Sequence, residues 1–386
     1  MTPDETQLRE ILIAWADINS GSGNIPGLER MRAALALEFS TLPGAAVEHV
    51  SLEETPAKAL RVRVRPQAPT QILFSGHYDT VYGPDHLFQR CTLLDDDILR
   101  GPGVADMKGG IVVMLTALRE FERTTGASRI GYEVFLTPDE ETGSVASRSW
   151  LAAAGASRRF AFALVFEPAR ANGDLVKSRR GTGIFTVTCH GRAAHAGRDP
   201  AAGRNAILAL AEFLPHADAL NRELPGVMLN IGSIRGGGAV NIVPDFAAAE
   251  LNIRIARISD EALALAHLQK LAAPLNARDG FRLEIVGRFN RPPKETTPAE
   301  ERLFSAWQEC GRELGVHFSW QDVAGGSDGN LLSAAGLANL DGLGPIGDHL
   351  HSSDEFVIFS SLVERAHVAA RFLTRFAAAE IALPRP

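Results

Sequence analysis

The feature that most constrains the fold of this chain is the alternation of short apolar segments with helical ones in its first half. Residues 70–76, 130–137 and 162–167 have the pattern of strands that are apolar at almost every position, and residues 111–122 have the pattern of a helix. Strands of this kind are typical of a sheet that helices cover on both faces. The first half of the chain therefore predicts an α/β domain.

A second pattern begins near residue 178. It predicts a strand, a helix, two strands, a helix and a strand, at residues 183–191, 203–220, 227–234, 247–256, 259–275 and 281–289. This order is the ferredoxin-like split βαβ arrangement. Segments of the first kind resume after two consecutive prolines. We therefore predict one α/β domain formed by residues 1–177 and 295–386, with an α+β domain inserted at residues 178–294.

The charge balance excludes some classes of partner. The 386 residues include 39 Lys and Arg against 46 Asp and Glu, which gives a net charge of -7, and no block of basic residues stands out. A mildly acidic chain of this kind is a poor candidate for binding nucleic acid or an anionic membrane surface. We expect neither partner.

The cysteines and the N-terminal segment bear on the cellular compartment. Cys91, Cys189 and Cys310 lie far apart and form no C-x-x-C pair, which favours a reducing compartment over a disulfide framework. Residues 1–19 alternate charged and apolar residues like an amphipathic helix, without the continuous apolar core of a signal peptide. No run approaches the roughly 20 apolar residues that span a bilayer. We expect a soluble, cytoplasmic protein.

Histidines and carboxylates follow the predicted strands or precede the predicted helix. His77 and Asp79 come directly after the strand at 70–76, and Asp106 lies in a glycine-lined turn before the helix at 111–122. Sites in open α/β sheets form at the carboxyl ends of strands, and a metal-binding histidine needs an acceptor that fixes its tautomer, as Asp79 can. Each residue also has a structural explanation, since a histidine at a strand end is often structural and Asp106 could cap the helix.

Further carboxylates and two histidines occur in three other segments. Glu140 and Glu141 follow the strand at 130–137, Glu167 ends the strand at 162–167, and His349 and His351 lie near the C-terminus. The acidic pair could equally form a solvated turn. Together these residues form a set of histidines and carboxylates without a thiolate, which suits Zn²⁺ or a similar divalent ion. The set is large enough for two ions that share one bridging carboxylate.

Five segments in this order carry a resemblance to a known family: SGHYDTV, GPGVADMKGG, TPDEETGS, FEP and HLHSSDEF. They resemble the M20 family of di-zinc peptidases and amidohydrolases, and among its branches most closely the glutamate carboxypeptidase (carboxypeptidase G2) branch. The resemblance extends over nearly the whole chain. It implies a zinc-peptidase-like mixed sheet flanked by helices, with an inserted ferredoxin-like lid and dimerisation domain.

The resemblance also implies roles for individual residues. It assigns one Zn²⁺ to His77, Asp106 and Glu167, and a second to Asp106, Glu141 and His351, so that Asp106 bridges the two. It makes Glu140 the general base, and Asp79 the residue that orients His77. His351 is preferred to His349 because the family's ligand precedes a glutamate by about four residues, as His351 precedes Glu355. Mn²⁺ or Co²⁺ could occupy the same ligands.

In the inserted domain the resemblance singles out three residues. It implies that His195 reaches the substrate of a partner subunit in a homodimer and helps to stabilise the developing oxyanion, and that Asn241 and Arg254 bind substrate. The guanidinium of Arg254 could bind a free carboxylate through two hydrogen bonds. Structural explanations remain, because His195 could simply end a strand and Arg254 alternates with Ile253 and Ile255 as an exposed strand residue would.

The implied function is hydrolysis of the amide bond of an N-acyl amino acid or short peptide that has a free carboxylate, with glutamate as one candidate for the released residue. The attacking group would be a hydroxide held by the two zinc ions, with Glu140 moving its proton. A deacylase of the acetylornithine or succinyl-diaminopimelate type, from the same family, is the alternative.

Parts of the sequence are also compatible with two other classes of protein. GGSDG at residues 325–329 matches the G-x-S-x-G elbow of serine hydrolases, with Ser327 as nucleophile and Asp341 or Asp348 and then His351 following in order. That interpretation leaves the carboxylates before residue 168 unexplained, and M20 proteins carry a similar segment beside the substrate pocket. A binding protein that has lost catalysis is the third class, although every residue that catalysis requires is present.

Overall fold

The computed structural model describes residues 5–381 and divides the chain into two compact units. Unit 1 contains the residues up to Ser178, Thr296–Val323 and the residues from Ser327 on. Unit 2 contains Arg179–Glu295 and Ala324–Gly326. Each main boundary lies one residue after the predicted one, and the segment 324–326 was expected in the other domain. Residues 1–4 and 382–386, which the predicted domain and N-terminal helix included, lie outside the described part.

Unit 1 is built on a mixed six-stranded sheet in the order β1-β2-β6-β3-β7-β14. The strands β3, β6, β7 and β14 run parallel, whereas β1 and β2 are antiparallel to their neighbours. Their bounds are Ala46–Ser51 (β1), Lys58–Val64 (β2), Gln71–His77 (β3), Gly131–Thr137 (β6), Phe160–Val165 (β7) and Asn339–Leu340 (β14). The predicted α/β fold is confirmed.

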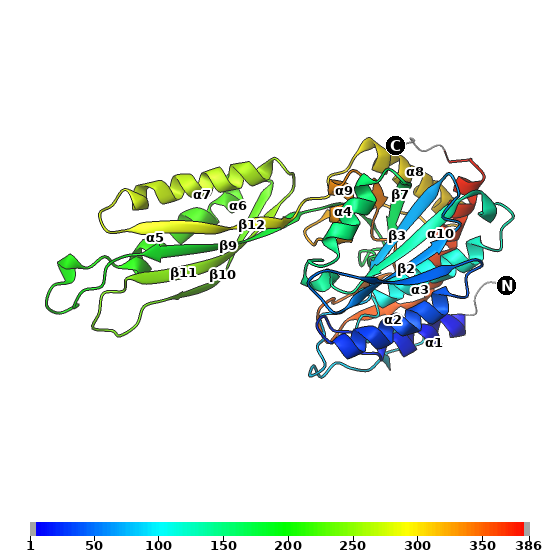
Figure 1. Cartoon of the computed structure of the whole chain (residues 1–386), viewed down its shortest axis with the longest axis horizontal. Helices are drawn as coiled ribbons and strands as arrows, with labels where there is room; N and C mark the ends of the chain where they lie inside the picture. The colour runs from blue at the N-terminus through cyan, green and yellow to red at the C-terminus, as the bar shows by residue number, and fades with distance from the viewer. Residues whose placement is uncertain (1–4, 382–386) are drawn as a thin grey trace. The chain divides into compact units, whose positions relative to one another are not determined.

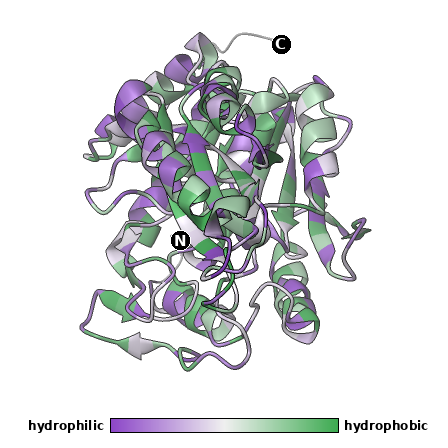
Figure 2. Cartoon of the chain, turned by 90° about the vertical axis from the view of Figure 1, so that its left-hand side faces the viewer, coloured by the Kyte–Doolittle hydropathy of each residue, from purple (hydrophilic) through white to green (hydrophobic). Residues whose placement is uncertain are grey.

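Helices lie on both faces of this sheet (Figure 1). Their bounds are Glu5–Ala16 (α1), Ile25–Phe39 (α2), Lys108–Phe121 (α3), Arg148–Ala156 (α4), Pro298–Glu313 (α8), Asp328–Ala334 (α9) and Phe359–Ala377 (α10). Figure 2 shows hydrophobic and hydrophilic residues alternating along helices of the chain, as in helices that bury one apolar side. Among the described residues no helix has both the length and the apolar content needed to cross a bilayer.

The two faces of the sheet bury separate hydrophobic clusters. Because successive strand residues point to opposite faces, Ile72 and Phe74 of β3 join the cluster that α1, α2, α3, α8 and α10 share. Leu73, between them, joins the cluster of α4 and α9. This two-sided burial explains why the strands are apolar at nearly every position.

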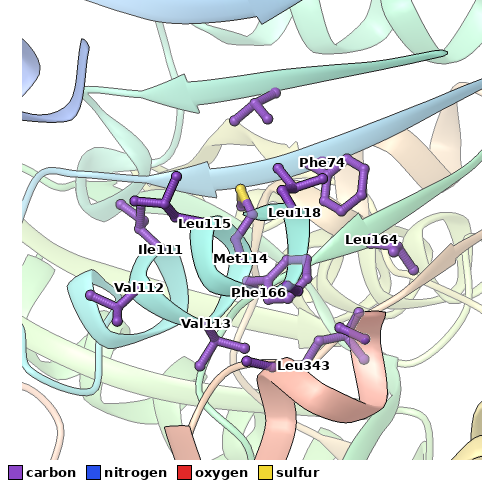
Figure 3. Packing of buried hydrophobic residues seen from close by; sticks show 14 of the residues in the cluster. Phe74, Ile111, Val112, Val113, Met114, Leu115, Leu118, Leu164, Phe166 and Leu343 are labelled. Atoms are coloured by element: carbon purple, nitrogen blue, oxygen red, sulfur yellow. The ribbon is translucent and has the colours of Figure 1, made fainter. Parts of the chain in front are cut away.

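Helix α3 is the most deeply buried of these helices. Its residues from Lys108 to Leu118 are almost all buried, because the sheet lies on one side of it and α10 on the other. Figure 3 shows Met114 and Leu118 of α3 close to Phe74 of β3 and to Phe166. The helix begins two residues after Asp106, so its packing holds the start of the helix, and the turn before it, against the sheet.

A second, smaller sheet of unit 1 has the order β15-β16-β5-β4. It consists of strands of two or three residues: Thr92–Leu93 (β4), Ile98–Arg100 (β5), Gly347–Asp348 (β15) and Phe356–Ile358 (β16). Two further short strands, Leu175–Arg179 (β8) and Trp320–Val323 (β13), pair with each other. The small sheet joins two segments that are far apart in sequence, one before Asp106 and one around His351.

Unit 2 is a four-stranded antiparallel sheet in the order β10-β11-β9-β12, with helices packed on one face. Its elements are Gly181–His190 (β9), Ala206–Asp218 (α5), Leu220–Glu223 (α6), Val227–Gly236 (β10), Phe246–Ile255 (β11), Asp260–Asn276 (α7) and Arg282–Arg291 (β12). The order of strands along the chain and across the sheet is that of the ferredoxin-like arrangement predicted for this segment.

Candidate metal centre

The sheet of unit 1 brings the strand-end residues to one edge. His77 is the last residue of β3, and Glu141 lies in the 3-10 helix η2 (Glu140–Thr142) that follows β6. Glu167 follows β7. Because β3 pairs in parallel with both β6 and β7, these three segments leave the sheet at the same edge.

Asp106 lies at the centre of the group. Its Oδ1 is 3.2 Å from Nε2 of His77, and its Oδ2 is 3.4 Å from Nε2 of His351. One carboxylate therefore faces two histidines, each through a different oxygen. Asp106 is held there by the turn before α3, and His351 by the turn between β15 and β16.

Two further carboxylates complete the group. Oε1 of Glu167 lies 3.8 Å from Nε2 of His77, and Oε2 of Glu141 lies 3.2 Å from Nε2 of His351. His77, Asp106 and Glu141 have ligand atoms within 4.8 Å of one another. The structure thus brings together all five residues that the sequence predicted as metal ligands. His349 takes a different direction, with its ring 5.9 Å from that of Phe356.

The charges in this group perturb one another strongly. Burial alone would lower the pKa of His77, but hydrogen bonds to Asp106 and Asp79 raise it well above its ordinary value. Hydrogen bonds to Asp106 and Glu141 raise the pKa of His351 to about 11.

The carboxylates show the reciprocal effect. Burial would raise the pKa of Asp106, but hydrogen bonds from His351 and His77 hold it well below its usual range. Burial and the negative charge of Asp106 raise the pKa of Glu141 to about 7. So many buried carboxylates around two imidazoles form a site that a divalent cation would stabilise.

The donor atoms fit such ions in kind and in spacing. Imidazole nitrogen and carboxylate oxygen are common zinc donors, and tetrahedral bonds of about 2.1 Å place neighbouring donors about 3.4 Å apart. The four separations given above, 3.2, 3.4, 3.8 and 3.2 Å, lie around this value. Two of these separations involve His77 and the other two involve His351. Asp106 is the residue that occurs in both sets.

Asp79 supports several members of the group at once. Its backbone oxygen and its Oδ1 lie 3.1 Å and 3.3 Å from Nδ1 of His77, on the side of the ring away from Asp106. Its carboxylate also accepts hydrogen bonds from the backbone N–H groups of Glu140 and Glu141, at 3.1 Å and 3.2 Å. Ser22 donates a further hydrogen bond of 2.7 Å to it. Asp79 therefore fixes the turn that carries both glutamates.

Buried carboxylates also support this turn from behind. Asp139 accepts hydrogen bonds from the backbone N–H groups of Ala146 and Ser147 and from the Ser147 hydroxyl. Asp328, at the start of α9, accepts a 2.8 Å hydrogen bond from Thr137 at the end of β6 and another from Ser144. The turn that carries Glu140 and Glu141 is thus held from several directions.

The GGSDG segment has a structural role. Ser327 is fully buried, its hydroxyl donates a 2.7 Å hydrogen bond to Asp341, and it caps α9 by accepting from the Gly329 N–H. A serine nucleophile needs an accessible hydroxyl beside a histidine. The serine hydrolase interpretation is therefore wrong, because Ser327 is buried as the N-cap of α9.

Unit 2 contains the other three predicted residues. The segments of His195 and Asn241 pair there, through a bridge between His195 and Ile242 and a 2.9 Å hydrogen bond from the Ala196 N–H to the Asn241 carbonyl. Arg254 lies half-buried on β11 and donates hydrogen bonds to the side chain of Asn252 and, at 2.6 Å, to the carbonyl of Ala324.

Three residues near the metal centre were missed in the sequence. Ser22 lies in the glycine-rich segment SGSGN, which contains no histidine or carboxylate. Tyr82 follows the HYDTV segment, and Glu355 entered only as a spacing mark for His351. Their hydrogen bonds join residues distant in sequence, so no local pattern indicates them.

The mixed sheet and the cluster of histidines and carboxylates at its edge define a class of protein, the metal-dependent hydrolases of amide bonds. Comparison with known proteins agrees. The sequence pattern of Peptidase family M20/M25/M40 matches residues 73–375, and the chain belongs to this family.

Relatives with assigned activities extend over most of the chain. Carboxypeptidase G2 from Pseudomonas sp. (strain RS-16) is 25% identical over 378 residues, which cover 96% of this chain and 90% of that protein. Succinyl-diaminopimelate desuccinylase from Verminephrobacter eiseniae is 30% identical over 328 residues, covering 81% and 80%. The predicted resemblance and the prediction of an enzyme of the peptidase or aminoacylase type are confirmed.

Solved structures share the fold. Aminopeptidase PepT from Bacillus cereus superposes with a TM-score of 0.81 at 18% identity, covering 97% of this chain and 99% of that one. The YXEP protein from Bacillus subtilis, described as a dinuclear metal binding peptidase of the M20 family, has a TM-score of 0.69 at 14% identity and covers 98% and 99%.

Proposed function

We propose that the protein hydrolyses the amide bond of an N-acyl amino acid or short peptide that has a free carboxylate, with two divalent ions as cofactors. His77, Asp106 and Glu167 would hold one ion, and Asp106, Glu141 and His351 the other. The observation that carries this proposal is the placement of the two Asp106 oxygens, each beside a different histidine. Zn²⁺ is the proposed metal because the donors are imidazoles and carboxylates.

The bound ions would polarise the scissile carbonyl and lower the pKa of water toward neutrality. The side chain of Glu140 would act as the general base and not as a metal ligand. It is the neighbour of Glu141 on η2, and Asp79 accepts a hydrogen bond from its backbone N–H. Glu140 would accept a proton from the attacking water and deliver it to the leaving amine. Asp79 would keep the His77 ring in the tautomer that ligation requires.

The relatives support the class of substrate. They include a carboxypeptidase and a desuccinylase, so both the peptide and the N-acyl amino acid remain candidates. Arg254 would bind the free carboxylate, and Asn241 would contact the substrate as well. The carboxypeptidase G2 relative, which covers 96% of this chain, favours release of a C-terminal residue such as glutamate. The desuccinylases at 30% identity favour the deacylase alternative.

A homodimer formed by unit 2 is part of this proposal. Strand β10 is an edge strand, and large apolar side chains on it, after it and on α5 are exposed: Ile234 at 60%, Val240 at 101% and Leu208 at 66%. Unpaired strand edges and exposed apolar side chains of this kind favour association with a second copy.

The three free cysteines support a reducing, cytoplasmic location.

The role of His195 can be tested by mixing subunits. If His195 acts on the partner's substrate, a mixed dimer of Glu140→Gln and His195→Ala subunits contains one complete site and recovers activity that neither homodimer has. A mixed dimer as inactive as its parents would contradict that role.

The main test is an assay of N-acyl and C-terminal amino acids with and without a chelator. Hydrolysis that is lost on chelation and restored by Zn²⁺ is expected; chelator-insensitive hydrolysis would refute the proposal.

A further inference from the structure

Glu355 is a buried carboxylate that binds the backbone of the turn carrying Asp106. Its side chain is 1% exposed. Oε1 accepts hydrogen bonds from the N–H groups of Ala105 and Asp106, at 3.0 Å and 3.1 Å. Oε2 accepts one of 3.1 Å from the Gly103 N–H and lies 2.8 Å from the hydroxyl of Tyr82. Both oxygens of Glu355 therefore accept hydrogen bonds from the backbone of this turn.

The backbone of Glu355 is fixed by the small sheet. Glu355 immediately precedes β16, where Phe356 is paired with Arg100 of β5. Its carbonyl accepts a 3.1 Å hydrogen bond from the Gly101 N–H. The strand pairing thus places the side chain directly over the turn that follows β5, and this turn ends at Asp106.

The same residue is connected to the segment of His351. The N–H of Glu355 donates to the carbonyl of Ser352, and the Tyr82 hydroxyl lies 2.7 Å from that carbonyl as well as near Oε2 of Glu355. The hydroxyl has one proton, so it donates to one of these two acceptors at a time. Tyr82 and Glu355 together join the two segments that carry Asp106 and His351.

We propose that Glu355 is a positioning residue of the metal centre: its carboxylate holds the turn at residues 103–106 so that Asp106 faces His77 with one oxygen and His351 with the other. This inference rests on the metal site proposed above. A buried carboxylate close to another carboxylate costs free energy, and a residue that only filled the core would not need the charge. Backbone N–H groups that converge on both oxygens account for its presence, because a carboxylate can accept them all.

An amide cannot replace this arrangement. Each oxygen of Glu355 accepts from at least one backbone N–H. In Glu355→Gln, either orientation of the amide directs its NH₂ group at a backbone N–H, where no hydrogen bond can form. The turn must then shift, and Asp106 with it. Tyr82→Phe is the matched control, because it removes one neighbour of the same carboxylate and leaves the three backbone hydrogen bonds in place.

The test is titration of metal-free protein with Zn²⁺ in the presence of a competing chelator. Because Asp106 belongs to both proposed sets of ligands, Glu355→Gln is expected to weaken both binding steps, by about 10- to 100-fold each. Tyr82→Phe is expected to weaken them less. His351→Ala provides the reference for a variant in which one step alone is affected. Unchanged affinity in Glu355→Gln, or loss of one step only, would overturn the inference.

Two further measurements distinguish a positioning role of Glu355 from a general effect on the stability of the fold. The thermal midpoint of the metal-free variant shows how far the fold itself is weakened, and excess Zn²⁺ is expected to restore turnover with an unchanged KM. If the midpoint falls while the folded fraction binds Zn²⁺ like the wild type, Glu355 is only structural. Failure of the proposed function is distinguishable, because the wild-type protein would then bind no pair of ions at all.

Discussion

The Nε2 atom of His351 lies 3.4 Å from Oδ2 of Asp106, although the two residues belong to distant parts of the sequence. The pairing of β16 with β5 brings them together, since each residue lies in a turn next to one of these strands. Asp106 faces His77 through its other oxygen. This double orientation is the geometric basis of the proposed two-ion centre.

Removal of one terminal ligand should therefore affect one ion. His351→Ala is expected to retain about one tightly bound ion per chain, whereas Asp106→Ala should retain neither, because only Asp106 belongs to both sets. Metal content after dialysis, measured by atomic emission against protein concentration, checks this. Equal losses in the two variants would contradict a bridging Asp106.

Removal of the proposed base should separate catalysis from binding. Glu140→Gln is expected to keep both ions and to lose about 10²- to 10⁴-fold in kcat, because the amide cannot accept a proton. Glu141→Gln is the matched comparison on the adjacent residue, and it should lose metal as well as activity. Metal content and kcat are measured on the same samples. A Glu140→Gln variant with near-normal kcat would show that the base lies elsewhere.

Metal affinity should rise with pH. The raised pKa values of His77 and His351 favour the protonated form of both rings in the metal-free protein, and each ring must lose its proton to bind a metal. Binding therefore releases protons, and a fall in pH weakens it. Below about pH 7 the decline should steepen, because Glu141 then binds a proton too. Competition titrations at several pH values check this, and an affinity independent of pH would contradict it.

The carboxylate-binding role of Arg254 predicts a selective effect. Arg254→Ala is expected to lower kcat/KM about 10- to 100-fold for substrates with a free carboxylate, since hydrogen bonds to charged groups contribute about 1.5–3 kcal/mol. The same substrates with a terminal amide serve as controls and should be affected little by the substitution. An equal loss for both kinds of substrate would show that Arg254 supports the fold of unit 2 through its hydrogen bond to Ala324.

The sequence predicted the parts of the fold that repeat a pattern. Strands such as β3 and β6 are buried over all seven residues and contain runs of apolar residues, and the helices between them have clear periodicity. The edge strand β1, AVEHVS, is half exposed and gave no such signal. The small sheet could not be predicted, because strands of two or three residues form only where distant segments meet.

In the metal centre, too, the sequence indicated the residues that follow a local pattern and missed contacts that only the fold creates. Strand ends indicated that His77 and Glu167 could lie close together, since parallel strands share an edge. The preference for His351 over His349 came from the family resemblance alone, because both follow the same short strand. The sequence used Glu355 only to identify His351, and it did not indicate the contacts of Glu355 with the N–H groups of Gly103, Ala105 and Asp106, which only the folded chain brings near it.

The most direct test of the two-ion centre is anomalous diffraction at the zinc absorption edge from crystals of the Zn²⁺-loaded protein. The account predicts two anomalous peaks about 3.5–4 Å apart, one between His77 and Asp106 and the other between Asp106 and His351. A single peak, or peaks away from Asp106, would contradict it.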